Sequence, residues 1–208
     1  MRILITGGYG FIGSHTAERF HKEGHDIYII DNLSFGKKEN LNIKHTFFNI
    51  DASDERCKEI FANNSIDVVI HLAAQNNFDQ YDEYSKSNIL GLVNMLSLSK
   101  EHNIKKFIFS SSASVYGNPT KTRVDEQEKC NPISEDGLNK LVGEKYCKFY
   151  NDIYGLNTVI LRLSNVYGPR QFSNDKNSIA FTFFQTIVNN EITICQNREP
   201  IQDFIYVE

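Results

Sequence analysis

The first thirteen residues constrain the fold of this chain more than any other stretch, because an apolar run passes directly into a glycine-rich turn. Residues 2–6 are mostly apolar or β-branched, and Gly7 follows them at once. Gly7, Gly10 and Gly13 are spaced Gly-x-x-Gly-x-x-Gly, and Gly8 with the last two also satisfies Gly-x-Gly-x-x-Gly. The pattern predicts a buried strand, a tight turn and then a helix.

Such a turn suits a phosphate ligand. Glycine lets backbone N–H groups approach a pyrophosphate, and the helix that begins near Phe11 adds further N–H groups and a partial positive charge. We therefore expect a dinucleotide to bind at Gly7, Gly10, Phe11, Ile12 and Gly13. The glycines alone leave a plain structural turn as the alternative.

An acidic residue stands where the second strand of this unit should end. Asp31 closes the run DIYIID, eighteen positions after Gly13. A carboxylate there accepts hydrogen bonds from both hydroxyls of an adenosine ribose and repels a 2′-phosphate, so NAD is favoured over NADP. Asn32 follows and is expected in the same pocket. A helix-cap or turn role for Asp31 is the alternative.

Length and composition indicate an ordinary cytoplasmic protein. The chain has 208 residues, which suits one domain or one and a fraction. Its net charge of −4, without runs of like charge, gives no reason to expect nucleic acid or a membrane surface as a partner. The first strand begins directly after Met1, which leaves no room for a signal peptide, and no apolar run approaches a membrane span. The cysteines lack metal-ligand spacing, so we expect reduced thiols and no metal site at Cys57, Cys130, Cys147 and Cys195.

Strand and helix patterns alternate along the rest of the chain. After the first βαβ unit we expect strands at residues 45–50, 66–72, 106–109 and 157–163, and helices at residues 53–63, 82–103 and 136–154. The alternation predicts an α/β fold, a Rossmann-like doubly wound parallel sheet in strand order 3-2-1-4-5-6. The residues expected to face inward on the last two helices are Ile89, Leu92, Val93 and Leu96, and Leu138, Leu141, Val142 and Phe149.

Three loops should meet at one edge of this sheet. In this strand order ligands bind outside the carboxyl ends, where the winding reverses, so the glycine turn, residues 71–75 and residues 110–114 face one crevice. Asp51 and Ala52 end the third strand within reach of an adenine ring, although Asp51 could equally be a turn residue. The other expected cofactor contacts are Leu72, Ala73, Ala74 and Ser110.

Four segments together resemble a known family. They are TGGYGFIG from residue 6, HLAAQ from residue 71, SSSASVYG from residue 110 and LRLSNVYGPR from residue 161. They resemble the extended short-chain dehydrogenase/reductases, specifically the NAD-dependent nucleotide-sugar epimerases such as UDP-glucose 4-epimerase, over essentially the whole chain. The resemblance implies a tightly held NAD that removes hydride from a sugar carbon and returns it to the other face of a transient ketone. It also implies a UDP-linked sugar as substrate and a homodimer formed through pairs of helices.

Individual roles follow from the resemblance. Ser112 would hydrogen-bond the reacting hydroxyl, and Lys140 would bind the nicotinamide ribose and supply a positive charge. Asn88 and Tyr116 would lie near the reacting sugar or the cofactor pocket, and Asn165 near the diphosphate of the substrate. Each residue also has a structural alternative as a turn, packing or capping residue.

The resemblance breaks at the catalytic base. The family expects Tyr-x-x-x-Lys, whereas Asp136 stands four residues before Lys140. An aspartate is shorter by a ring and ordinarily titrates near pH 4, against about 10 for tyrosine. We therefore expect oxidation of the sugar to be slowed by orders of magnitude, although a bridging water could leave some activity. A catalytically silent NAD-binding module, or another member such as a nucleotide-sugar reductase, is the alternative function.

The chain differs from the family pattern in two further places, one after Ser112 and one near its end. The dehydratase branch places an Asp-Glu pair where Ala113 and Ser114 stand, which argues against dehydration. Gln202 stands where an arginine would meet the substrate diphosphate, and the chain ends where relatives continue. We expect an NAD-binding domain over residues 1–168. Residues 169–208 are expected to begin a truncated substrate domain, with a returning core strand near 203–207.

Overall fold

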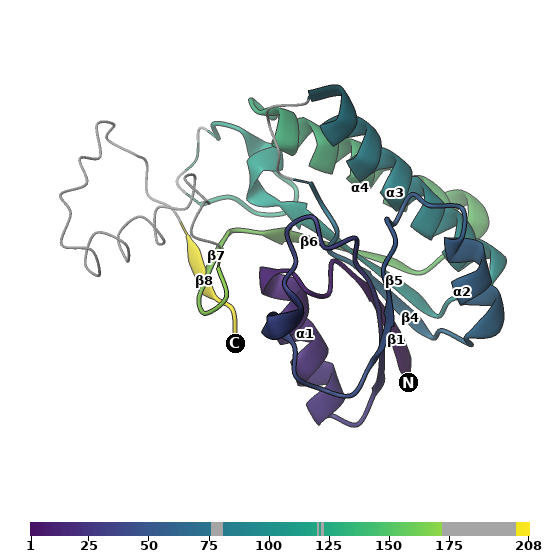
Figure 1. The fold of residues 1–208 in the computed structure, drawn as a ribbon. Helices are drawn as coiled ribbons and strands as arrows, with labels where there is room; N and C mark the ends of the chain where they lie inside the picture. The colour runs from purple at the N-terminus through teal and green to yellow at the C-terminus, as the bar shows by residue number, and fades with distance from the viewer. Residues whose placement is uncertain (76–80, 120, 122, 172–202) are drawn as a thin grey trace, which may run out of the picture.

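A computed structural model of the chain describes residues 1–75, 81–119, 121, 123–171 and 203–208. Within these residues, six parallel strands form one sheet in the order β3-β2-β1-β4-β5-β6, and helices cover both of its faces (Figure 1). The predicted α/β class and the predicted strand order are both confirmed. The winding reverses between β1 and β4, so the carboxyl ends of these two strands form the expected binding edge.

The elements lie close to their predicted positions. The strands of the sheet are β1 (Arg2–Thr6), β2 (Asp26–Ile30), β3 (Thr46–Phe48), β4 (Val68–His71), β5 (Lys106–Ser112) and β6 (Thr158–Leu163). The helices are α1 (Phe11–Lys22), α2 (Cys57–Asn63), α3 (Tyr81–Glu101) and α4 (Glu135–Tyr154), with single 3-10 turns η1 (Lys38–Asn40) and η2 (Ala113–Tyr116).

Two apolar clusters hold the layers together. Leu4 of β1 faces the cluster that α2, α3 and α4 cover, whereas Ile3 and Ile5 face the cluster that α1 covers. Both faces of β1 and β4 are buried, which explains why their sequences are continuously apolar rather than alternating. Each fully buried Leu or Ile contributes about 1.5–3 kcal/mol, so the central strands anchor the edge where the site forms.

Two element boundaries differ from the prediction for local reasons. α2 begins at Cys57 rather than near residue 53, because the carboxylates of Asp51 and Asp54 accept the backbone N–H groups of Ser53 and Arg56 and form turns there. β5 runs on through Ser112 and pairs with β6 from Phe107 to Ser112. The first three serines of the predicted loop at residues 110–114 are therefore part of the strand, and the rest of that loop begins η2.

The predicted inward face of α4 is wrong for Leu138 and Phe149, which are 52% and 48% exposed. Leu141 and Val142, predicted on the same face, are half-buried. The buried residues of this helix are Gly137, Gly143, Glu144 and Cys147. A Cβ at Gly143 would lie 2.6 Å from the ring of Phe109, so only a glycine lets the helix approach the sheet this closely. On α3 the prediction holds for Leu92 and Leu96, which are buried.

A separate small sheet follows the core. β7 (Asn165–Tyr167) pairs in parallel with β8 (Phe204–Tyr206). The strand predicted near residues 203–207 is therefore present, but it joins β7 and not the six-stranded sheet. Gln202 and Cys195 lie outside the described residues, and Cys57, Cys130 and Cys147 are free thiols. Among the described helices, none has the length and apolar character needed to span a membrane.

Candidate cofactor and reacting site

An open cavity of about 110 Å³ lies at the carboxyl ends of β1, β2 and β4. Ten of the predicted site residues line it, namely Gly7, Gly10, Asp31, Asn32, Asp51, Ala52, Leu72, Ala73, Ala74 and Asn88. His71 and Gln75, from the loop predicted to face the crevice, also line it, whereas the sequence did not indicate Ser34, Phe35 and Gly36. Phe11, Ile12 and Gly13 form the first turn of α1, directly after the lining residue Gly10.

The glycine turn is packed too closely for any side chain. Gly7 has φ +71°, and a Cβ there would lie 2.9 Å from the backbone nitrogen of Ala73. A Cβ at Gly13 would collide with the carbonyl oxygen of Gly7. In the described residues no side chain caps α1 at Gly10, so the N–H groups of its first turn are offered to an anion. This turn is shaped to receive a pyrophosphate.

The carboxylate of Asp31 is fixed at the cavity wall. Asp31 is 8% exposed, and its two oxygens accept the backbone N–H groups of Tyr9, at 2.9 Å, and Leu33, at 2.8 Å. A carboxylate has about four acceptor positions, so two remain for the hydroxyls of a ribose. The position and hydrogen bonds of Asp31 agree with the ribose interpretation.

Asp51 is a turn residue that also faces the cavity. One of its oxygens accepts the N–H and the hydroxyl of Ser53, at 2.9 and 2.7 Å, and the other accepts the amide of Asn32 at 2.8 Å. The turn interpretation is therefore what the hydrogen bonds show. The link to Asn32 joins the segments that follow β2 and β3 at the cavity wall.

His71 is a buried wall residue that sequence reasoning did not single out. Its ring stacks against Phe107 and Phe109, and its Nδ1 lies 2.9 Å from the hydroxyl of Thr6, which accepts the N–H of Ala73. Burial and, to a smaller extent, the positive charge of Lys140 together lower the pKa of His71 to about 3. The imidazole is therefore neutral near pH 7, and its position at the end of β4 was the available sequence signal.

Lys140 reaches the serine segment from α4. Its Nζ donates to the carbonyl oxygen of Ser110 at 2.8 Å and lies 5.4 Å from the centroid of the Phe109 ring. Burial lowers the pKa of Lys140, and the charge of Asp136 opposes this. Lys140, Asp136 and the serines at the end of β5 are thus brought together as predicted.

Ser114 joins Ser112 to Asp136, a contact the sequence did not reveal. The Ser112 hydroxyl oxygen accepts the backbone N–H of Ser114 at 3.1 Å and lies 2.8 Å from the Ser114 hydroxyl. The Ser114 hydroxyl in turn lies 3.1 Å from Oδ2 of Asp136, to which it can donate. A protein hydroxyl therefore bridges the carboxylate and Ser112.

A buried ion pair ties α4 to the neighbouring strands. Glu144, one turn after Lys140, accepts two hydrogen bonds from Arg162 of β6, at 2.9 and 2.7 Å, and one from the hydroxyl of Ser111. Arg162 also donates to the hydroxyl of Tyr116 at 2.8 Å. This cluster fixes α4 against the end of β5.

The remaining predicted substrate residues lie apart from one another. Tyr116 is held by Arg162, as above. The amide of Asn88 pairs with the backbone of Gln75 at the cavity wall. Asn165 donates to the carbonyl of Asp203 at 3.1 Å and so joins β7 to the segment before β8. The predicted site residues outside α1 that do not line the cavity are Ser110, Ser112, Tyr116, Asp136, Lys140 and Asn165.

Comparison with known proteins decides the family. Residues 3–208 match the NAD dependent epimerase/dehydratase family. The chain belongs to this family. It is 40% identical over 213 residues to a putative UDP-glucose 4-epimerase of Methanocaldococcus jannaschii, a match that covers 99% of this chain and 69% of that protein. It is 33% identical to an uncharacterized UDP-glucose epimerase of Bacillus subtilis, with 100% and 69% covered.

Solved structures of this epimerase/dehydratase family show the same fold. The UDP-glucose 4-epimerase of Thermotoga maritima, solved with UDP-glucose, has a TM-score of 0.94 and 37% identity, and the match covers 100% of this chain and 70% of that one. The Thermus thermophilus UDP-glucose 4-epimerase, a complex with NAD, has a TM-score of 0.91 and 31% identity, with 100% and 71% covered.

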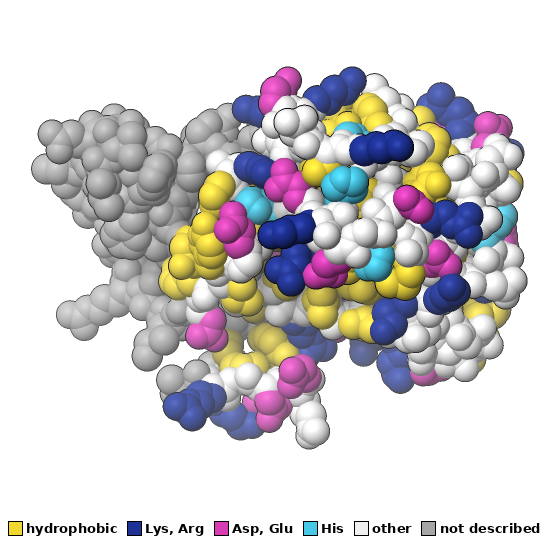
Figure 2. Space-filling view, turned by 90° about the horizontal axis from the view of Figure 1, so that it is seen from below, with side chains coloured by type: hydrophobic (Ala, Val, Ile, Leu, Met, Phe, Trp, Pro, Cys, Tyr) yellow, Lys and Arg dark blue, Asp and Glu magenta, His cyan; other side chains and the backbone are white. Residues whose placement is uncertain are grey.

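NAD is the cofactor of this epimerase/dehydratase family, and the described residues fit it. Gly7 and Gly13 leave space that any Cβ would fill, the start of α1 offers N–H groups to the pyrophosphate, and Asp31 presents a carboxylate to the ribose. The face of the molecule in Figure 2 carries interspersed basic and acidic side chains rather than a field of one sign.

Proposed function

We propose that the chain is an NAD-dependent nucleotide-sugar 4-epimerase that acts on a UDP-hexose through a transient 4-keto sugar, and that Asp136 impairs its catalysis. The observation that supports the proposal is that the cavity beside the glycine turn lies at the same edge of the sheet as Ser112, Asp136 and Lys140, which do not themselves line it. NAD would supply the hydride acceptor and donor. The protein's own residues would place the sugar and handle its proton.

The proton path runs through two serine hydroxyls. Ser112 would accept the hydrogen bond of the sugar hydroxyl, and the proton would pass from Ser112 Oγ to Ser114 Oγ and on to Asp136 Oδ2. The 2.8 and 3.1 Å separations permit both transfers. Lys140 would add a positive charge beside this chain. Because a carboxylate is a much weaker base than a tyrosinate, it takes the proton of the sugar hydroxyl less readily, so this path should be slower than direct transfer to a tyrosine.

The substrate would occupy the space beyond the serines. We propose roles in sugar or diphosphate binding for Asn88, Tyr116 and Asn165, and a domain division in which residues 1–168 bind NAD and residues 169–208 begin the substrate domain. The relatives named above include an epimerase solved with UDP-glucose, which supports a UDP-linked sugar.

A homodimer in the cytoplasm completes the proposal. α4 exposes apolar and aromatic side chains at spacings that lie on one helix face, at Leu138, Tyr146, Phe149 and Ile153. A second copy of this surface would cover them. Light scattering should report a dimer, and Phe149→Glu should yield a monomer; a monomeric parent would contradict this part of the proposal.

The activity itself is tested by product analysis. Purified chain incubated with NAD and UDP-glucose or UDP-N-acetylglucosamine should form the 4-epimer slowly, as resolved by anion-exchange chromatography, and Asp136→Tyr should form it faster. A catalytically silent module, which the presence of Asp136 favours as the second candidate, would give no epimer with either protein. Net oxidation or reduction of the sugar would instead indicate a reductase and contradict the proposal.

A further inference from the structure

A half-buried asparagine of α3 holds the segment that follows β3. The Nδ2 of Asn94 donates to the carbonyl oxygens of Ala52, at 2.8 Å, and Asp54, at 3.2 Å. Ala52 is 6% exposed and lines the cavity, as does Asp51 before it. One turn earlier on α3, Gly91 also lines the cavity, and a Cβ there would lie 3.4 Å from the Cβ of Ala52. α3 therefore packs directly against this wall of the cavity.

The other hydrogen bonds of residues 51–54 do not anchor this segment to the core. Within the described chain they are local to residues 51–57, apart from one between the Asp51 carboxylate and the exposed amide of Asn32. Local turns fix the shape of the segment but not its place relative to the sheet. Asn94, beside the fully buried Met95 on α3, supplies the hydrogen bonds that tie the backbone of the segment to the core.

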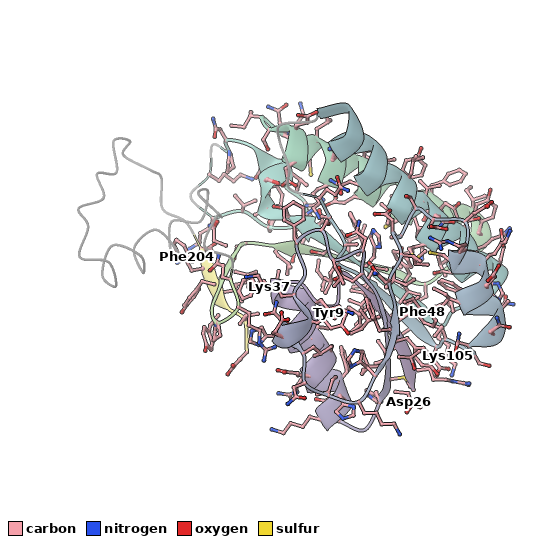
Figure 3. The ribbon with its side chains drawn as sticks, viewed as in Figure 1. Tyr9, Asp26, Lys37, Phe48, Lys105 and Phe204 are labelled. Atoms are coloured by element: carbon pink, nitrogen blue, oxygen red, sulfur yellow. The ribbon has the colours of Figure 1, made fainter. Side chains whose placement is uncertain are left out.

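The segment leaves the sheet beside the carboxylate that faces the ribose. Phe48, labelled in Figure 3, ends β3, and its carbonyl oxygen accepts the backbone N–H of Asp31 at 3.3 Å. With the ribose of NAD at Asp31, the base that this ribose carries would lie next to the neighbouring cavity residues Asp51 and Ala52. We call residues 51–54 the adenine wall.

We propose that Asn94 is a positioning residue that fixes the adenine wall. Asn94 is not among the residues that line the cavity, so it acts through Asp51 and Ala52, which are. A wall held in one place accepts a flat adenine base and leaves little room for a larger one. Without the Asn94 amide the wall keeps its local turns but can shift away from the cavity. This inference rests on NAD binding at the cavity and not on the epimerase reaction.

The test compares two cofactors in the full chain, freed of bound nucleotide. NAD⁺ and 1,N6-etheno-NAD⁺, whose base is larger and lacks the free amino group, are titrated calorimetrically into the parent and into Asn94→Ala. We expect the parent to favour NAD⁺ at least about tenfold, and Asn94→Ala to lower this affinity ratio at least about fivefold, because a wall without its anchor admits both bases.

Asn151→Ala is the matched control. The amide of Asn151 also donates to a main-chain carbonyl, that of Leu156 at 3.0 Å, but it comes from α4 and does not line the cavity, so its loss should leave the ratio unchanged. A parent that binds the two cofactors equally, or an Asn94→Ala ratio within about twofold of the parent, would overturn the proposal, since a merely structural role weakens both cofactors alike.

Hydrogen exchange separates a lost anchor from general destabilisation. In the nucleotide-free protein, Asn94→Ala should speed amide exchange in a peptide covering residues 51–56 at least about fivefold, while a peptide covering β1 exchanges as in the parent. Asn94→Ser covers the case in which Asn94→Ala does not fold, because its hydroxyl is too short to bind both carbonyls yet leaves room for water. Equal acceleration in both peptides would contradict the proposal. Neither readout involves turnover, so both are decisive whether or not the chain is an epimerase.

Discussion

The site has a cofactor half, around the glycine turn and Asp31, and a reacting half, around Ser112, Asp136 and Lys140. The two halves use different chemical groups. The cofactor half consists of backbone N–H groups, glycines and buried side chains such as Asp31 and His71, all anchored on β1, β2 and β4. The reacting half depends on side chains of α4 that reach over the end of β5, where Asp136 contacts Ser112 through Ser114. Backbone N–H groups keep their positions through most side-chain substitutions, so a binding site that uses them is preserved. A site that depends on one side chain loses its chemistry when that residue is replaced.

This difference explains why the two halves can diverge. The closeness of the glycine turn to Ala73 is a property of the fold itself, so NAD binding follows from the packed core. Proton transfer needs an acid of suitable length and pKa at a single position. If the two halves are independent, a substitution in one half should leave the other intact.

Glu144→Gln should destabilise the fold and the reacting half. Arg162 would keep its charge in a partly buried position without a charged partner, at a cost of about 3 kcal/mol of unfolding free energy. Denaturant unfolding measures this, and Glu18→Gln is the control, because the Arg170–Glu18 pair has side chains 26% and 34% exposed and should cost less than about 1 kcal/mol. Equal effects of the two variants would show that Glu144 does not anchor α4.

Gly13→Ala should abolish tight NAD binding while leaving the reacting half in place. The added Cβ collides with the Gly7 carbonyl and pushes α1 off the turn, so the affinity for NAD⁺ should fall at least about 100-fold, or ~2.7 kcal/mol. Gly155→Ala serves as the control, because Gly155 has open space around its Cβ position and does not line the cavity. A tenfold loss or less, measured by calorimetry, would mean that the turn is less constrained than described.

His71 should make stability depend on pH between about 6.5 and 3. In this range the unfolded chain binds a proton at His71 that the folded chain does not, so stability is lost as the pH falls from 6.5 towards the folded pKa of about 3. At pH 5 the loss from this residue should be about 2 kcal/mol. His71→Gln keeps an acceptor near Thr6 and should remove this share of the dependence. Identical pH profiles for the two proteins would contradict it.

The fold and most of the residues that line the cavity could be predicted from the sequence, because both follow from short motifs and from the alternation of strands and helices. Alternating strands and helices imply the strand order, and the order places the glycine turn, Asp31 and residues 71–75 together. Prediction failed where tertiary contacts decide. The apolar spacing of α4 identified one face of the helix, but Gly143 against Phe109 selects a different face for the sheet.

The contacts missed at the reacting site have the same origin. Ser114 acquires its role from η2, which turns its hydroxyl towards both Ser112 and Asp136. Gly36 packs against the Asp31 carboxylate because its loop folds back onto Tyr9. Neither arrangement follows from a periodic pattern or a spacing in the sequence.

The most direct test of the contrast between the two halves is single-turnover reduction of bound NAD. Parent, Asp136→Tyr and Asp136→Phe, each saturated with NAD⁺, are mixed with UDP-glucose while the absorbance near 340 nm is followed. We expect similar NAD⁺ affinity in all three proteins, and we expect NAD⁺ to be reduced at least about 100-fold faster in Asp136→Tyr than in the other two. A parent that reduces its cofactor as fast as Asp136→Tyr, or one that does not bind NAD⁺, would contradict it.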